Sequence, residues 1–344
     1  MSDMVKKNTL EAMPDVVMTR ILTDCNYADC QSLRKTCSRL RCQVDLLKPD
    51  PKIEAIRCIL NGSIIKMELR FFDGPHVDIR YENMPGVCVV TNKRRRYFKS
   101  TTAASVFCKD FQVIVSFGNW WKCQLLETLK ASMIRQSTPL EEFRVTVNEE
   151  AAPVFYDTIA PLLAEPAHIR VGILQLEADH PRHFMAVLPF VSPEALETVQ
   201  IRCSSEQPDV LLNLDEISEL DQWRSIKTLD ISHFAISDPT RVTNIPNIFI
   251  RMSTLSAEQL TQFKEKFQNA PNSVRCFIRV DNFANRIPAL RSVVPDVRDK
   301  FVIDAWYFRT QRQGKLLRLC AANDDVTFES VDFTELLPID TVRD

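Results

Sequence analysis

Four of the eleven cysteines lie near the start of the chain, where thiolates could together bind a metal ion. Cys25, Cys30, Cys37 and Cys42 are separated by four, six and four residues. Structural zinc sites usually hold paired thiolates about two to four residues apart on a tight turn, because four sulfurs must reach one tetrahedral point. Cys37 falls instead in a helical apolar pattern and no histidine is close in sequence. We therefore expect buried or half-buried cysteines and no metal site.

A second metal-like pattern is the H-x-x-H formed by His180 and His183, with Asp179 beside it. Pro181 lies between the two histidines and would break the helix needed to hold their spacing. The stretch therefore predicts a polar surface turn. Residue spacing singles out no carboxylate pair, no thiol with a base and no oxyanion loop. We expect a protein that is not an enzyme, with no catalytic residue and no cofactor.

The basic run from Lys93 to Arg96, in "NKRRRYF", could bind nucleic acid or act as a nuclear-import signal. The neighbouring segments add no basic stripe, and the formal net charge of the chain is -2. The run is more typical of a solvated turn between two strands. Neither nucleic acid nor a membrane is expected as the main partner.

Glycine usage excludes two further classes of protein. The six glycines are widely scattered, whereas phosphate-binding Rossmann and Walker loops need several within a few residues. The chain also has no apolar run long enough to cross a membrane, and its start lacks the apolar segment of a secretory signal. We expect a cytoplasmic and/or nuclear protein whose cysteines are reduced.

The elements that carry these residues begin with a flexible stretch, 1–11, and a helical block, 12–48. Apolar residues at helical spacing after Pro14 predict a helix near 14–24. A second apolar stripe steps by four and three residues and consists of Leu33, Cys37, Leu40, Val44 and Leu47. Pro49 and Pro51 end this pattern.

The next segment, 53–135, changes to the two-residue period of strands. "IIKMELRFF", "HVDIRYEN", "GVCVVTN" and "FQVIVSF" are rich in β-branched and aromatic residues, and the turn sequences "FDGP" and "NMPG" occur between strands. They predict a small antiparallel β unit. The stretch "NWWKCQLLETLKASMIRQ" then predicts a connecting helix.

A weak internal repeat organises the last segment, 136–340. The pattern apolar-x-x-apolar-x-apolar begins at Leu140, Val171, Leu196, Ile226 and Ile245, and an incomplete sixth copy pairs Val274 with Phe277. Each copy predicts a strand with a return segment, such as "APVFYDTIAPLLA" or "LSAEQLTQFKEKF", the latter capped by Ser256 and Gln259. Strands stacked in this way would form an irregular leucine-rich-repeat-like platform, ending in a terminal hairpin. An ordinary α/β domain with similar strands is the alternative, so the expected fold class is α+β or α/β.

The helical block resembles the F-box, over about residues 12–46. The positions that match are Met13-Pro14, Ile21-Leu22, Leu33 with Arg34, Thr36-Cys37 and Arg39-Leu40. Two positions depart from the family: Val16 stands where an acidic residue is common, and no tryptophan occurs near the end. The resemblance implies a three-helix module that docks on a Skp-family adaptor, and through it on a cullin. It assigns docking to Met13, Pro14, Ile21, Leu22 and Leu33.

The rest of the chain is similar to the FTH, or F-box associated, domain of a family abundant in nematodes. The matching stretches are "VFCKDFQVIVSF", "LDISHFAISDP" and "LSAEQLTQFKEKF". The resemblance implies the substrate receptor of a Skp/cullin/F-box ubiquitin ligase, which holds a target while its partners carry ubiquitin. The alternative is a repeat-type scaffold whose helical start is only a cap.

A protein target would bind solvent-facing strand positions of the platform, since these alternate with the buried ones. Phe249 is the best expected anchor, because it is an aromatic residue at an outward position beside an arginine. The alternative is that Phe249 packs under a loop. The expected target-binding residues are Arg144, Gln175, Gln200, Arg202, Asp230, Phe249 and Arg251.

Overall fold

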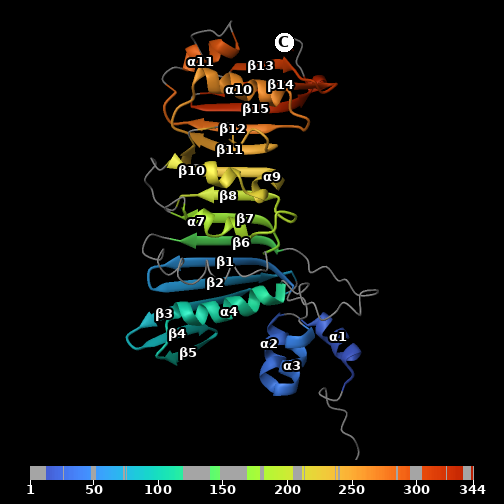
Figure 1. The fold of residues 1–344 in the computed structure, drawn as a ribbon, viewed down its shortest axis with the longest axis vertical. Coiled ribbons are helices and arrows are strands. Elements are labelled where there is room, and N and C mark those ends of the chain that lie inside the picture. The colour runs from blue at the N-terminus through green and yellow to red at the C-terminus, as the bar shows by residue number, and fades with distance from the viewer. Residues whose placement is uncertain are drawn as a thin grey trace, which may run out of the picture. The chain divides into compact units, whose positions relative to one another are not determined.

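The structure is a computed structural model (Figure 1) that describes residues 13–25, 27–47, 52–72, 74, 76–118, 140–147, 169–178, 182–203, 211–212, 214–236, 238, 241–283, 286–294, 304–322, 324–335 and 342–343. Helices accompany a mixed sheet, which confirms the α+β fold class. Among the described helices, none has the length and apolar character needed to cross a membrane. The segments 1–11, "NWWKCQLLETLKASMIRQ" and "APVFYDTIAPLLA" lie outside the described residues.

Contacts divide the chain into two compact units. Unit 1 contains the described residues up to Arg144, together with residues 169–171. Unit 2 contains residues 145–147 and the described residues from Gly172 onward. Strand β6 (Leu140–Val147) contributes residues to both units.

Three ten-residue helices form the helical block at the start of unit 1. They are α1 (Asp15–Asp24), α2 (Tyr27–Thr36) and α3 (Ser38–Leu47), and α1 confirms the helix predicted near 14–24. The block has a small core of its own, made of Met18, Leu22, Cys30, Leu40 and Val44. An ion pair of 2.7 Å between Arg34 Nε and Asp45 Oδ1 links α2 to α3.

The predicted apolar stripe from Leu33 to Leu47 is interrupted at Cys37, where α2 has ended and α3 begins. The Leu40 amide donates a hydrogen bond of 3.5 Å to Cys37 Sγ. First-turn amides lack a partner within their own helix, so this thiol caps the start of α3. The cysteine therefore has a structural use inside the block.

The β unit consists of five strands that pair antiparallel, each with the next. They are β1 (Ile53–Asn61), β2 (Ile64–Phe71), β3 (Val77–Met84), β4 (Val87–Asn92) and β5 (Arg94–Lys99). The antiparallel unit and its strands β2, β3 and β4 confirm the prediction, whereas β1 and β5 were not predicted as strands. The turn sequence "NMPG" joins β3 to β4. Its Gly86 has a φ of 73°, a left-handed conformation that favours glycine.

The prediction of a strand at "FQVIVSF" is wrong, because this stretch lies in helix α4 (Ala103–Gly118). Phe107, Phe111 and Ile114 are buried and recur at helical spacing. The Phe107 ring packs edge-on against Tyr81 of β3, with 5.5 Å between the ring centroids. Burial of this stripe against the strands outweighs the local preference of β-branched residues for a strand.

The prediction of a solvated turn at Lys93–Arg96 is right for Lys93, which joins β4 to β5, and wrong for Arg94 to Arg96, which belong to strand β5 (Arg94–Lys99). At this turn, the Lys93 amide donates to Asn92 Oδ1 at 2.7 Å. All six residues of β5 are exposed, and the strand pairs with β4 at an edge of the described sheet. Charged side chains are tolerated there, since they discourage pairing with other chains.

Unit 2 is built on five neighbouring strands that pair parallel, as a repeat of strand and return segment predicts. In spatial order they are β7 (Val171–Ala178), β8 (Thr198–Arg202), β10 (Thr228–Ile236), β11 (Asn247–Met252) and β12 (Arg275–Val280). A two-residue strand, β9 (Leu211–Leu212), also pairs with β10. Alternate residues such as Leu174, Val199 and Leu229 are buried, which forms the core of unit 2.

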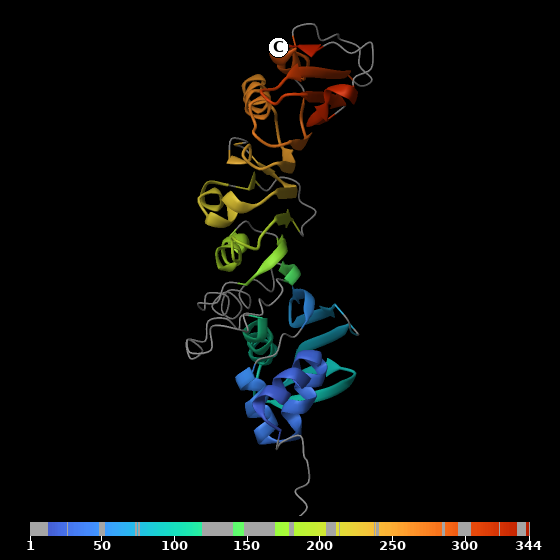
Figure 2. The same ribbon diagram turned by 90° about the vertical axis from the view of Figure 1, so that its right-hand side faces the viewer.

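Helices cover one face of these strands, as Figure 2 shows. They are α7 (Arg182–Met185), the 3-10 helix η6 (Leu188–Phe190), α8 (Asp215–Ser218), α9 (Asp221–Ser225), α10 (Ala257–Gln268) and α11 (Arg286–Val293). The predicted cap of α10 is confirmed: Ser256 Oγ accepts from the Gln259 amide, and Gln259 Oε1 accepts from the Ser256 amide. We call the opposite side of the strands the open face.

The end of unit 2 is antiparallel. Strand β15 (Asp325–Asp332) pairs with β12, and β14 (Lys315–Ala322) lies between β15 and β13 (Asp304–Arg309). The β13–β14 pair confirms the predicted terminal hairpin. The 3-10 helix η8 (Phe333–Glu335) follows β15, and β16 (Val342–Arg343) pairs with β13.

The sixth repeat was assigned to the wrong register. Cys276, Ile278 and Val280 are the buried residues of β12, while Phe277 is half-buried and Arg279 is exposed. In register, Ile248 of β11 is paired with Cys276, and Phe249 with Phe277. A shift of one residue moves every side chain of a strand to the other face. Phe277 therefore lies on the open face and not in the core.

Candidate functional site

The open face of unit 2 brings four of the expected target-binding residues into one row. Gln175 is paired in register with Gln200, Gln200 with Asp230, and Asp230 with Phe249. The row continues through Phe277 of β12. Parallel strands in register place equivalent side chains side by side, so residues far apart in sequence form a continuous surface.

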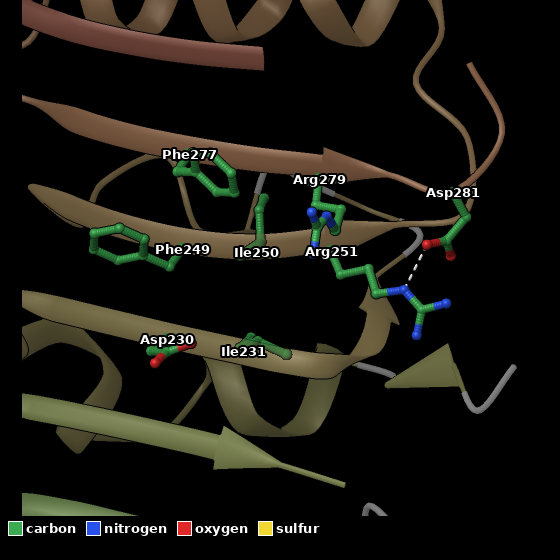
Figure 3. A pocket seen from close by; sticks show the side chains of 8 residues that line it. All are labelled: Asp230, Ile231, Phe249, Ile250, Arg251, Phe277, Arg279 and Asp281. Atoms are coloured by element: carbon green, nitrogen blue, oxygen red, sulfur yellow. Dashed lines mark hydrogen bonds and ion pairs between the residues drawn. The ribbon is translucent and has the colours of Figure 1, made fainter. Parts of the chain in front are cut away.

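A hollow of about 490 Å³ lies at the β10–β12 end of this row (Figure 3). Ile231 and Ile250 are almost fully buried where they line it. The complete lining is Asp230, Ile231, Phe249, Ile250, Arg251, Phe277, Arg279 and Asp281. Three of the residues expected to bind a target, Asp230, Phe249 and Arg251, thus share one concave site.

Two phenylalanines form the apolar wall of the hollow. The Phe249 and Phe277 ring centroids are 6.3 Å apart and the rings are tilted by 32°. This contact leaves Phe249 39% exposed. Exposed aromatic side chains that are fixed on a strand are suitable anchors for a partner, because little conformational entropy is lost when they are covered.

Ion pairs surround the aromatic wall. Arg251 Nε donates to Asp281 Oδ1 at 2.5 Å, while Arg279 Nε lies 3.5 Å from Asp325 Oδ1. On the neighbouring strand β8, Arg202 Nη2 lies 4.0 Å from Asp230 Oδ2. Solvent screens the two more exposed pairs, those of Arg279 and Arg202, so they contribute little to stability and remain available to a partner.

Sequence reasoning missed three residues of the hollow: Phe277, Arg279 and Asp281. All three are on or next to β12, whose register was misassigned. The alternation of Cys276, Ile278 and Val280 was the signal that could have revealed it, because a half-buried strand buries every second residue.

A bulge in β10 also adjusts this region. Ile231 is paired with Ile250, but the next pair joins Ala235 to Arg251. The extra residues of β10 therefore displace the partner of Arg251 along the strand. Bulges redirect side chains next to functional surfaces, and no sequence pattern indicated this one.

Arg144 differs from the other expected target-binding residues, because it falls in unit 1. Its Nη2 lies 3.0 Å from Glu142 Oε1. Gln175 and Gln200 belong to the row but do not line the hollow, and Arg202 of β8, which is paired with Glu177 and Ser232, lies outside both. Of the seven residues expected to bind a target, only Asp230 of β10 and Phe249 and Arg251 of β11 thus line the hollow.

The residues expected to dock on an adaptor divide into two groups. Leu22 is 1% exposed and belongs to the core of the helical block, whereas Met13, Ile21 and Leu33 are only partly buried against that core. Pro14 is exposed. The block also exposes apolar residues that sequence analysis did not select, namely Val16, Val17 and Leu46.

The cysteines of the block do not form a metal site in the described structure. Cys30 is buried while Cys42 is exposed, and no group of three potential ligands gathers among the described residues. Burial raises the pKa of Cys30 to about 12, so its thiol stays protonated at neutral pH. Burial also raises the pKa of Cys25. Metal ligands must be thiolates, which these environments disfavour.

We expect Cys30 to react with iodoacetamide far more slowly than the exposed Cys42. A thiol with a pKa of about 12 is ionised only about one part in 10,000 at pH 8, and the thiolate is the nucleophile. Labelling of the native chain followed by peptide mass spectrometry would measure both rates, with the denatured chain as control. Equal rates in the native chain would contradict the burial of Cys30.

The H-x-x-H pattern is only partly described, since Asp179, His180 and Pro181 lie outside the described residues. His183 is 4% exposed and begins the short helix α7 with Arg182 and Phe184. The prediction of a polar surface turn is therefore wrong for the described part of this stretch, because Arg182–Met185 is helical and His183 is buried on the helix-covered side of unit 2.

Comparison with known proteins identifies part of the chain. Residues 154–289 match the family model of the FTH domain. No curated protein and no solved structure matches the chain significantly. The matched stretch includes strands β7 to β12 and all eight residues that line the hollow. The hollow thus lies within the stretch that matches the FTH domain.

Proposed function

We propose that this protein is the substrate receptor of a Skp/cullin/F-box ubiquitin ligase. The helical block would act as an F-box that docks on a Skp-family adaptor, and the FTH domain would hold a protein target. The chain itself would do no ubiquitin chemistry, because its contribution is proximity. It would act in the cytoplasm and/or nucleus.

The observation that carries this proposal is an FTH domain at residues 154–289 on the same chain as a separate three-helix block. In the family that the chain resembles, this domain follows an F-box on the same chain. The block supports the proposal physically, because its core is small and it leaves apolar residues such as Val16 and Leu46 exposed. A partner helix or groove could cover these residues and complete the packing.

The open face supports the second half of the proposal. Its side chains alternate with the core residues of the same strands, so the surface can change without loss of the fold. It combines exposed aromatic and arginine side chains, which are enriched in the centres of protein interfaces. This combination favours a protein target over a small metabolite.

The test is direct binding of the purified chain to a purified Skp-family adaptor, measured by biolayer interferometry. We expect the double variant Pro14→Ala, Ile21→Ala to bind about 30-fold more weakly, as expected for a loss of about 2 kcal/mol at a hot spot. Pro14 is exposed and Ile21 partly buried, so neither replacement removes a fully buried side chain.

The matched control is Phe72→Ala, which truncates an exposed apolar side chain outside the helical block and should leave adaptor binding unchanged. Amide exchange of α1–α3 would verify that the double variant is folded. Two results would reject the receptor function: a wild-type chain that does not bind the adaptor, or a folded double variant that binds equally well. The first would favour a repeat-type scaffold without a ligase.

A further inference from the structure

The hollow offers two kinds of contact at a fixed separation. Phe277 and Arg279 are two residues apart on β12, and both are at open-face positions. A strand advances about 3.3 Å per residue, so the two side chains leave the sheet about 6.6 Å apart. An extended peptide has the same spacing between residues i and i+2, which point to the same side.

Arg279, and Arg202 on the neighbouring strand β8, reach further into solvent than the carboxylates that accompany them. The Arg279 side chain is 66% exposed and that of Asp325 is 32% exposed. The side chains of Arg202 and Asp230 are 48% and 26% exposed, respectively. A partner that approaches the open face therefore meets guanidinium groups first. Charge complementarity then favours an acidic partner.

Arg251 has a different role. Its side chain is only 17% exposed and is held by Asp281 at 2.5 Å. This pair forms a fixed wall of the hollow, visible in Figure 3, beside the more exposed Arg279. Asp230 and Asp281 line the hollow together with Arg251 and Arg279, so the lining carries both signs of charge. A nucleic acid, with a charged phosphate at every nucleotide, is therefore disfavoured as the occupant, whereas a single carboxylate can contact Arg279 alone.

We propose that the hollow binds an extended segment of a protein target, with an apolar side chain on the Phe249–Phe277 wall and an aspartate or glutamate two residues away on Arg279. The carboxylate accepts hydrogen bonds from the guanidinium, which is a strong and directional contact. The inference rests on the proposed function for its protein target. It adds a sequence preference that the target must satisfy.

The experiment presents a displayed library of random peptides to the full-length chain. We expect the enriched peptides to share an aromatic or aliphatic residue with an acidic residue two positions away. One enriched peptide, synthesised with a fluorophore, then provides the affinity by fluorescence polarisation. The same peptide with lysine in place of its acidic residue, called the lysine peptide, should bind at least about tenfold more weakly.

Three variants test the two contacts. The double variant Phe249→Ala, Phe277→Ala should bind the acidic peptide about tenfold or more weakly than wild type, because central aromatic anchors dominate such interfaces. Arg279→Glu should reverse the preference, so that the lysine peptide binds better than the acidic one. Arg275→Glu is the matched control: Arg275 is on the same strand and 63% exposed, but it does not line the hollow.

The proposal fails if no shared pattern is enriched, or if the phenylalanine double variant, with an unchanged unfolding midpoint, binds the peptide as tightly as wild type. It also fails if Arg279→Glu retains the acidic preference, or if single-stranded DNA displaces the peptide. The adaptor assay is a separate measurement. A chain that binds the peptide but no adaptor would reject the ligase and retain the hollow, whereas the opposite result would reject only the hollow.

Discussion

Replacing Phe263 with alanine is expected to lower the free energy of unfolding by about 3–5 kcal/mol, which is the largest single effect we foresee in unit 2. Phe263 of α10 is fully buried. Its ring packs against Phe267 of the same helix, at 5.6 Å between centroids, and against Phe328 of β15, at 6.0 Å. Truncation would leave a cavity where α10 meets the strands that carry the hollow.

Urea denaturation followed by circular dichroism would measure this loss. The matched control is Phe333→Ala, since Phe333 is 58% exposed and should change the stability by no more than about 0.5 kcal/mol. A loss below about 1 kcal/mol in Phe263→Ala would show that α10 does not pack as described. In Phe263→Ala, peptide binding should fall together with stability. In the Phe249→Ala, Phe277→Ala double variant, peptide binding should fall while stability is unchanged.

Replacing Leu22 with alanine should unfold the helical block while the strands of unit 1 keep their structure. Leu22 is 1% exposed, and five buried residues make up the core of the block. Removing a buried leucine costs about 2–5 kcal/mol, while a core of this size supplies only a few kcal/mol in total. The three helices should therefore lose their protection as a unit.

Amide exchange read by mass spectrometry would detect this change over α1–α3. Val16→Ala is the matched control, because Val16 is on the same helix and 77% exposed, and alanine favours a helix more than valine does. Its exchange should be equal to wild type or slower. Unchanged protection in Leu22→Ala would contradict the packing. If the variant unfolds as expected, any loss of adaptor binding would follow from unfolding and not from a lost contact.

Predictions from sequence were most accurate where a pattern is local. The helix at Asp15–Asp24, the cap at Ser256 and the hairpin of β13 and β14 depend on residues close in sequence. The alternation of buried and outward residues along β7, β8, β10 and β11 was also predicted correctly, since each strand has one buried face. This was enough to place Phe249 and Asp230 on an outward row.

Predictions failed where a partner far away in sequence decides between two local choices. "FQVIVSF" suits a strand by composition, but Tyr81 of β3 and the helical stripe from Phe107 make it part of α4. The basic run Lys93–Arg96 was predicted to be a turn, but pairing with β4 makes all of it except Lys93 part of the edge strand β5.

The amino-acid sequence by itself determined the succession of a helical block, a β unit and a stack of strands with helices, and the outward position of Phe249. Tertiary structure alone decided that Phe277 and Arg279 join Phe249 at the hollow. Two registers of β12 compete in the sequence: Val274 and Phe277 follow the repeat pattern until Arg279 breaks it, while Cys276, Ile278 and Val280 alternate without interruption. Pairing with β11 and β15 selects the register that buries Cys276 and Ile278, and it thereby exposes the aromatic side chain on which the candidate site depends.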